Sequence, residues 1–186
     1  TMKTDKGEWL VHRYTEPGKA AAELLPGIVE RALDRLPTPK RMRWGASRAE
    51  FIRPVHWVLA IHGGDVVDMT LFGHAAGNAT YGHRFHHPDA LTVARPADYA
   101  EVLRESGHVL ADFAERRERI EAQVKEAAEQ AGGTARIDAD LLDEVTALVE
   151  WPVAVAGQFE ERFLDVPHEA LMYTMQDDQK YFPVLD

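Results

Sequence analysis

The segment YGHRFHH, from Tyr81 to His87, places three histidines and an arginine within seven residues. Histidine nitrogens are frequent zinc ligands, so His83, His86 and His87 first suggest a metal site. Zinc takes three or four ligands in tetrahedral geometry, whereas the adjacent His86 and His87 would point to opposite sides of an extended chain. The sequence also lacks cysteine and the HExxH motif. We therefore favour no metal here and interpret the imidazoles, with Arg84, as hydrogen-bond donors to backbone or phosphate.

Side chains that could act as nucleophiles or hold phosphate are scarce elsewhere. Ser47 and Ser106 are the only serines and neither lies in a GxSxG motif, while the absence of cysteine excludes a thiol nucleophile. The phosphate-binding patterns GxxxxGK[ST] and GxGxxG are missing. In MQDDQKY, Asp177, Asp178 and Lys180 offer an acid–base group or a magnesium site, but aspartate pairs commonly cap helices or form turns. We therefore predict no catalytic, cofactor-binding or metal-binding residue.

One basic segment, interleaved with aromatic side chains, is a candidate for contact with nucleic acid. Its cations lie within 14 residues and are Lys40, Arg41, Arg43, Arg48 and Arg53. Trp44 and Phe51 lie among them, and such a mixture can hold a phosphate backbone and stack on bases. The alternative, favoured by composition alone, is a solvated basic edge that pairs with the acidic remainder. For Trp44 we favour a place in the core over a stacking role.

Composition narrows the classes of protein that remain. The 186 residues suit one domain or two small subdomains, and 45% of them are hydrophobic, enough for a core. The net charge of −10 argues against broad, non-specific binding to nucleic acid. No run approaches 18 apolar residues and no signal-peptide pattern opens the chain, so we expect a cytoplasmic protein with no membrane contact. The apolar final segment QKYFPVLD, without a stop signal, indicates a piece of a longer protein.

Strand patterns concentrate in the first half of the chain. Alternating apolar residues around Gly63-Gly64 predict a β-hairpin over residues 55–72, because glycine tolerates the positive φ of tight turns. Further short strands are predicted over residues 8–14, 91–93, 108–112 and 153–156, the last of them buried.

Helical patterns occupy most of the remainder. A helix over residues 19–36 is weakened by Pro26-Gly27, and further helices are expected after Pro96, Asp112 and Asp138, with both aspartates as N-caps. The closing segment is expected to hold a turn, a helix and the start of a strand. The fold class is therefore α+β, an antiparallel hairpin-containing sheet packed with several helices. We take residues 1–186 as a single unit, and the alternative is a strand-rich half over residues 1–95 followed by a helix-rich half over residues 96–186.

Five sequence blocks occur in an order that resembles a known family. They are KRMRWG (40–45), RPVHW (53–57), GHRF (82–85), DEVTALVEWPVAVAGQFEERFLDVPHEAL (143–171) and DDQKYFPV (177–184). One block alone would be weak, but five in order over nearly the whole chain are specific. The sequence resembles the β subunit of the bacterial heterotetrameric glycyl-tRNA synthetase. One departure is Asp178, because that family is expected to carry histidine there.

The resemblance implies an α2β2 ligase that attaches glycine to tRNA(Gly). The α subunit would carry the class II site and use ATP and magnesium, while the β subunit would bind tRNA and also contain an HD-type domain and a C-terminal anticodon-binding domain. This chain would be an N-terminal to middle fragment of β that is catalytically inactive alone and holds no cofactor. Its partners would be the α subunit, other β domains and tRNA(Gly).

Under the leading hypothesis this fragment supports tRNA binding and α2β2 assembly. The residues expected to contact tRNA phosphates are Lys40, Arg41, Arg43, Arg53, His83 and Arg84. A second hypothesis is a purely structural or interaction module of the β subunit. A remote third is an editing-type hydrolase domain, although no base–nucleophile pair is visible.

Overall fold

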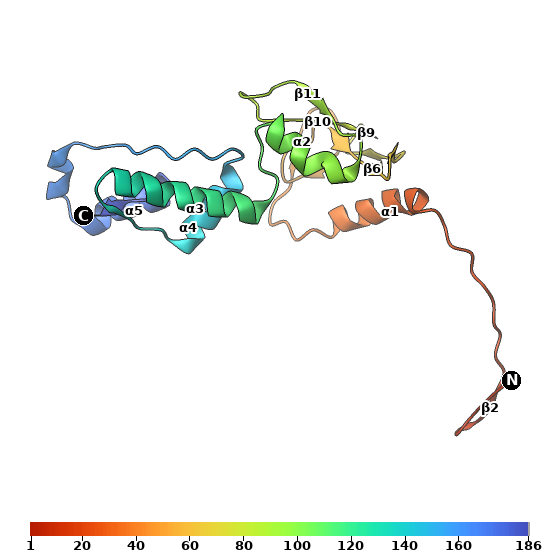
Figure 1. Ribbon diagram of the computed structural model, residues 1–186. Helices are drawn as coiled ribbons and strands as arrows, with labels where there is room; N and C mark the ends of the chain where they lie inside the picture. The colour runs from red at the N-terminus through yellow and green to blue at the C-terminus, as the bar shows by residue number, and fades with distance from the viewer. Residues whose placement is uncertain (186) are drawn as a thin grey trace. The chain divides into compact units, whose positions relative to one another are not determined.

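The chain folds as α+β, which confirms the predicted class (Figure 1). The computed structural model describes residues 1–185. Contacts divide the chain into two compact units, Thr1–Gly77 and the residues from Asn78 onward. The strands lie in several small sheets of two or three strands, and residues 78–95, which the sequence patterns group with the strand-rich half, belong to the second unit.

The first unit contains one helix and several short strands. Their bounds are β1 Met2–Thr4, β2 Gly7–Trp9, α1 Ala21–Asp34, β3 Met42–Arg43, β4 Glu50–Phe51, β5 Val58–Leu59, β6 Ile61–His62, β7 Asp65–Val66, β8 Thr70–Leu71 and β9 His74–Gly77. The pairs β1–β2, β3–β4 and β6–β7 are antiparallel. In the three-stranded sheet, β9 lies between β5, to which it is parallel, and β8, to which it is antiparallel.

The hairpin around Gly63-Gly64 is confirmed at its turn, where Ile61 pairs with Val66 and Gly63 adopts a φ of 64°. The predicted alternation also holds beyond the turn, since Val67 and Met69 are buried between exposed neighbours. The hairpin is shorter than predicted, however. The β5 strand pairs with β9 instead of continuing the ladder, because β9 returns alongside it and satisfies its backbone groups.

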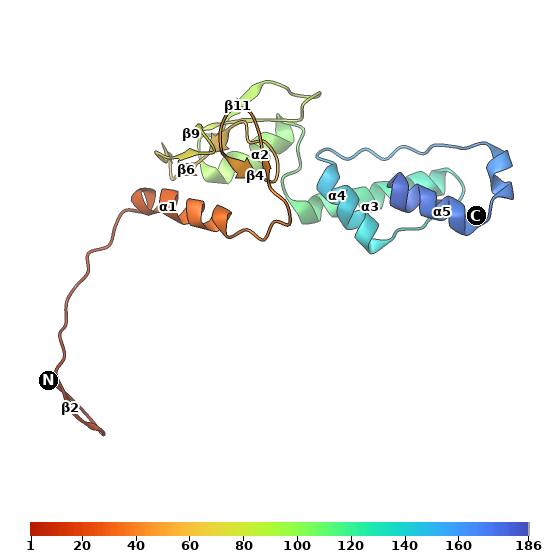
Figure 2. The same cartoon turned by 180° about the vertical axis from the view of Figure 1, so that it is seen from behind.

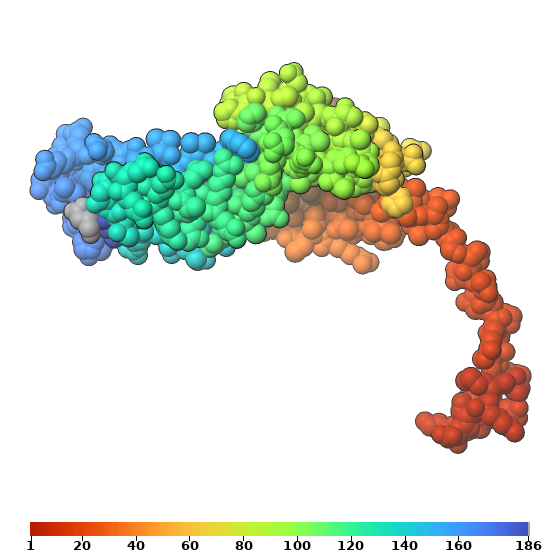
Figure 3. Space-filling view, in the orientation of Figure 1, coloured from red at the N-terminus to blue at the C-terminus, as the bar shows by residue number. Residues whose placement is uncertain are grey.

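The beginning of the chain differs from the prediction. The strand expected over residues 8–14 is wrong, because β2 ends at Trp9 and pairs back onto β1. Residues 1–24 are all exposed, and the space-filling view shows the residues before α1 as a thin extended segment (Figure 3). The predicted helix is confirmed as α1, which tolerates Pro26 at the loss of one backbone hydrogen bond.

The second unit contains most of the helices. Its elements are β10 Ala79–Tyr81, β11 Ala90–Thr92, η1 Pro96–Asp98, α2 Tyr99–Glu105, α3 Phe113–Gln130, β12 Thr134–Ala135, α4 Ala139–Leu148, η2 Glu161–Asp165, α5 His168–Tyr173, η3 Thr174–Asp178 and β13 Val184–Leu185. The pairs β10–β11 and β12–β13 are antiparallel. Helices α3 and α4 pack side by side in both views (Figures 1 and 2). The fully buried side chains of this unit include Val93, Leu110, Leu142 and Thr146.

The predicted N-caps of α3 and α4 are confirmed. The Asp112 carboxylate accepts a 2.8 Å hydrogen bond from the backbone N–H of Glu115. Asp138 accepts from the N–H groups of Asp140 and Leu141, each at 3.0 Å. These bonds satisfy amides that have no partner within the helix.

Two strands predicted in the second unit are wrong. Residues 108–112 form no strand, although Leu110 is buried and its N–H donates to the carbonyl of Glu150. Residues 153–156 form neither a strand nor a buried segment, since Val153 and Val155 are 69% and 86% exposed. The Ala154 N–H donates to the side-chain oxygen of Gln123 on α3 at 2.8 Å, so a side chain takes the place of a neighbouring strand. Within residues 1–185, no helix has the length and apolar character needed to cross a membrane.

Candidate nucleic-acid interface

The basic segment in the first unit contains arginines that are already engaged. The Arg41 guanidinium donates to the carbonyls of Leu33 and Asp34, at 3.0 and 3.1 Å, and to the Thr38 hydroxyl at 3.1 Å. It therefore satisfies free carbonyls at the C-terminus of α1 and places a positive charge at the negative end of the helix dipole. Arg43 forms an ion pair with Glu50 across the β3–β4 ladder. Both arginines have a structural use in this fold.

The other cations of the segment remain available. Lys40, Arg48 and Arg53 are exposed, and among the described residues they form no hydrogen bond or ion pair. Trp44 is half-buried and lies against Phe72, with ring centroids 6.0 Å apart, and Phe51 lies 5.0 Å from the same ring. The aromatic side chains thus contact one another, with Trp44 half-buried and not in the fully buried core for which it was favoured, and the free cations are left to contact a ligand.

The loop that contains GHRF is built on two closely packed glycines in the second unit. The His83 N–H donates to the Gly107 carbonyl at 2.7 Å. A Cβ on Gly82 would lie 2.4 Å from the same oxygen, so only glycine fits there. The His83 Nδ1 accepts hydrogen bonds from the N–H groups of Phe85 and His86, at 3.2 and 3.3 Å. This imidazole therefore accepts backbone hydrogen bonds with Nδ1, whereas the sequence-based interpretation made it a donor.

Side chains from distant positions in the second unit extend this loop into a row of rings. The ring centroids lie 4.5 Å apart for His83–His86, 5.6 Å for His86–His108 and 5.4 Å for His108–Trp151. The Arg119 guanidinium lies over the Trp151 indole, 4.5 Å from its centroid, in a cation–π contact. We call these five residues the ring row.

Sequence reasoning did not find His108, Trp151 or Arg119. His108 lies in a non-helical stretch, Trp151 follows α4, and Arg119 lies on α3, so no local pattern links them. His108 also adopts a φ of 53°, a left-handed conformation that costs a side chain of this kind about 1–3 kcal/mol. Its buried Nδ1 has no hydrogen-bond partner among the described residues. Two energetic costs therefore accompany this position of the His108 ring: the left-handed backbone and the buried Nδ1 without a hydrogen-bond partner.

Two further residues of the loop face solvent. Phe85 is 84% exposed, with its ring 6.0 Å from that of His83. Arg84 is also exposed and, within residues 1–185, has no hydrogen-bonding or ionic partner.

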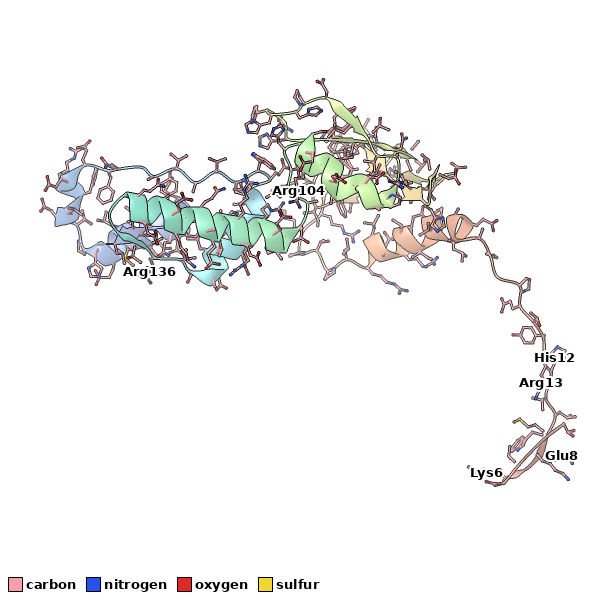
Figure 4. All side chains as sticks on the ribbon, in the orientation of Figure 1. Lys6, Glu8, His12, Arg13, Arg104 and Arg136 are labelled. Carbon is pink, nitrogen blue, oxygen red and sulfur yellow. The ribbon has the colours of Figure 1, made fainter. Side chains whose placement is uncertain are left out.

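Several other charges, most of them on or beside α3, are paired within the fold. On α3 the pKa of Glu121 lies below its usual range, because Lys125 donates a hydrogen bond to the carboxylate and the Arg117 charge adds to the effect. The pKa of Arg117 is raised, mainly by its hydrogen bond to Asp143. Arg104, labelled in Figure 4, pairs with Glu115. These paired side chains contrast with the unpaired cations of the basic segment and the GHRF loop.

The histidines and the MQDDQKY segment, considered above as metal or acid–base sites, do not assemble such a site among the described residues. No group of three histidine, aspartate or glutamate side chains in residues 1–185 could hold a metal ion. Lys180 pairs with Glu144 at 2.9 Å, which ties the MQDDQKY segment to α4. Among the predicted phosphate contacts, Lys40, Arg41, Arg43 and Arg53 lie in the first unit, and His83 and Arg84 in the second.

Comparison with known proteins places the chain among the subunits of aminoacyl-tRNA synthetases. The sequence model of the family described as glycyl-tRNA synthetase beta subunit matches residues 1–186. The chain belongs to this family, which confirms the predicted resemblance.

Individual relatives agree with the family match. The glycine–tRNA ligase beta subunit of Marinobacter nauticus is 58% identical over 187 residues, which cover 100% of this chain and 27% of that protein. The subunit of the same name from Hahella chejuensis is 53% identical over 185 residues, with the same coverage. That of Azotobacter vinelandii is 56% identical over 176 residues, or 94% of this chain and 26% of the relative. The chain thus spans about a quarter of the length of these curated relatives.

Proposed function

We propose that this chain is a tRNA-contacting portion of a glycine–tRNA ligase beta subunit, and that it supports the ATP-dependent attachment of glycine to tRNA(Gly). The aminoacylation site, with ATP and magnesium, would lie on a separate α subunit, as the resemblance implies. Family membership supports the ligase role. The observation that carries the tRNA contact is the set of exposed cations, Lys40, Arg48 and Arg53, that have no acidic partner in the described chain.

Phosphate binding requires a cation whose charge and donors are not already used. Arg41 is engaged at the end of α1, Arg43 pairs with Glu50, and the His83 Nδ1 is occupied within its loop. The proposal therefore rests on Lys40, Arg48 and Arg53 in the basic segment and on Arg84 in the GHRF loop. Contacts of this kind position RNA without reading its sequence.

Reversing two of the free cations, with Lys40→Glu and Arg53→Glu, should weaken tRNA(Gly) binding by the assembled ligase. Each charged hydrogen bond contributes roughly 1.5 kcal/mol or more, so the loss of two should weaken binding by at least about a hundredfold. The slope of log K against log salt should fall by about 2, because two phosphate contacts disappear. Filter binding or fluorescence anisotropy over a salt series measures both quantities.

A matched control is Lys3→Glu with Lys6→Glu on the β1–β2 hairpin, where Lys6 is labelled in Figure 4. Both lysines are exposed, and the pair changes the net charge by the same amount. Equal losses of tRNA affinity in the two double variants would show that the effect comes from net charge and not from these two positions. Unchanged affinity and salt slope in Lys40→Glu/Arg53→Glu would remove the basic segment from the tRNA surface.

A second candidate function, an interaction module within the ligase, is favoured by an exposed apolar segment. After α4 the chain exposes a series of large apolar side chains, which are Val153, Val155, Phe159, Phe163 and Leu164. Exposed apolar residues that gather on one segment indicate a protein-contacting surface more than isolated ones do. The partner would be the α subunit or another domain of the β subunit.

Introducing charge into this segment, with Val155→Asp and Leu164→Asp, should weaken subunit assembly. These side chains are 86% and 64% exposed, so the fold itself should lose little stability. Sedimentation velocity should show dissociation at concentrations where the parent enzyme remains assembled, while Leu10→Asp with Val11→Asp serves as the control in the first unit. If Val155→Asp with Leu164→Asp left the assembly constant unchanged, the segment would be excluded from the subunit interface.

A further inference from the structure

The backbone of the GHRF loop is fixed by several independent contacts. Gly82 packs directly on the backbone of Gly107, and His83 is held there by its N–H. Within the loop, two N–H groups donate to the His83 Nδ1, and the His87 N–H donates to the His83 carbonyl at 2.8 Å. Such a loop holds its tip in one position before any ligand arrives, which lowers the entropic cost of binding.

The side chain at the tip of this ordered loop is exposed. Phe85 is 84% exposed, although single exposed apolar side chains are common and carry no argument alone. What distinguishes Phe85 is its surroundings: a fixed backbone, the unpaired Arg84 beside it, and the ring row behind it through His83. Since the His83 Nδ1 accepts two hydrogen bonds, the neutral imidazole carries its proton on Nε2 and can donate from that atom.

The ring row adds aromatic surface and positive charge to the same side chains. From Phe85 the rings of His83, His86, His108 and Trp151 follow one another at 6.0, 4.5, 5.6 and 5.4 Å, and Arg119 covers the last of them. In the described residues, neither Arg84 nor Arg119 forms an ion pair. This positive, aromatic arrangement in a chain of net charge −10 is typical of surfaces that bind unpaired nucleotides.

The backbone of His108 supports a functional role for the row. A φ of 53° is uncommon for a residue other than glycine, and the buried Nδ1 of His108 lacks a partner in the described chain. Glycine at this position would relieve both costs but would remove the ring that joins His86 to Trp151. Strained residues of this kind concentrate at functional sites.

We propose that Phe85 stacks on the base of an unpaired nucleotide of the bound RNA while Arg84 contacts its phosphate. The ring row keeps the loop and its positive charge in place for that contact. An unpaired nucleotide is the ligand that fits, because a base within a duplex has both faces covered by its neighbours. The inference rests on the proposed tRNA contact and names the region of RNA that this loop would recognise.

The test compares Phe85→Ala, Phe85→Trp and Arg84→Ala in the assembled ligase. Stacking on an aromatic ring supports an expected loss of about 5- to 150-fold in tRNA(Gly) affinity for Phe85→Ala, with the salt slope unchanged. Phe85→Trp keeps an aromatic ring and should retain the affinity of the parent enzyme. Arg84→Ala should reduce the slope of log K against log salt by about 1. A single-stranded oligoribonucleotide should compete with tRNA better than a duplex of the same sequence, and only in proteins that retain the aromatic ring.

Tyr173→Ala is the matched control, because this aromatic side chain is 63% exposed and lies on α5. Unchanged affinity for Phe85→Ala, with a loss for Lys40→Glu/Arg53→Glu, would overturn the stacking proposal and leave the proposed function standing. No loss in either variant would overturn both. Loss of subunit assembly with intact RNA affinity in Phe85→Ala would assign the loop to a protein partner and would also overturn the proposal.

Discussion

Replacing Gly82 with alanine should destabilise the second unit by about 3 kcal/mol, the upper end of the range for overpacking. The new Cβ would lie 2.4 Å from the Gly107 carbonyl oxygen and 2.6 Å from the Gly107 Cα. These are backbone atoms, so no side-chain rotation relieves the contact, and the hydrogen bond from the His83 N–H is lost as the two backbones separate. Urea unfolding followed by circular dichroism measures the change in the free energy of unfolding.

Gly157→Ala is the matched control for this prediction. Gly157 lies in the same unit, and an added Cβ there meets no atom within 4 Å. We expect its effect to stay within about 0.5 kcal/mol, as for ordinary surface substitutions. Equal unfolding midpoints for the two variants would show that the close approach of Gly82 to Gly107 does not hold the loop.

Truncating Leu142 to alanine should cost about 2–5 kcal/mol. This side chain is 1% exposed on α4, and α4 packs against α3. Its removal loses apolar burial and leaves a cavity that the two helices close only incompletely. Thermal or urea unfolding of the chain provides the measurement.

Leu148→Ala on the same helix separates burial from helix propensity. Leu148 is 66% exposed, whereas Leu142 is buried. We expect a change below about 1 kcal/mol for this variant. If Leu148→Ala proved as damaging as Leu142→Ala, the packing of α4 described above would be incorrect.

The features that were predicted correctly depend on short stretches of sequence. The caps Asp112 and Asp138 act on amides two or three residues away, and Gly63-Gly64 closes a two-residue turn. Each of these effects is decided by neighbours in the chain, so composition and spacing are sufficient. The α+β class follows from them.

The features that were missed depend on residues far apart in the sequence. The segment from Val153 to Ala156 has the composition of a buried strand, but its backbone partner is the Gln123 side chain, 31 residues away from Ala154. In the same way, β5 pairs with β9 across an intervening hairpin. Whether an apolar run finds a strand beside it is decided by tertiary structure, and local propensity does not contain that information.

The candidate site shows the same division. The sequence was sufficient to identify the basic segment and the GHRF loop as candidates. Only the structure shows that Arg41 is already hydrogen-bonded whereas the adjacent Lys40 is free. His108 and Trp151 complete the ring row from positions about 20 and 65 residues beyond His86, and no spacing rule links them.

The single hydrogen bond between Ala154 and Gln123 also bears on how the last elements are retained. That bond joins the exposed segment after α4 to α3. The elements that follow the segment contact the rest of the second unit in other ways. The pairing of β12 with β13, the N–H of Arg136 on the Pro183 carbonyl at 2.8 Å and the Lys180–Glu144 ion pair anchor them to the helical core. After cleavage within the exposed segment, the later elements would remain linked to the helices of the second unit by these contacts.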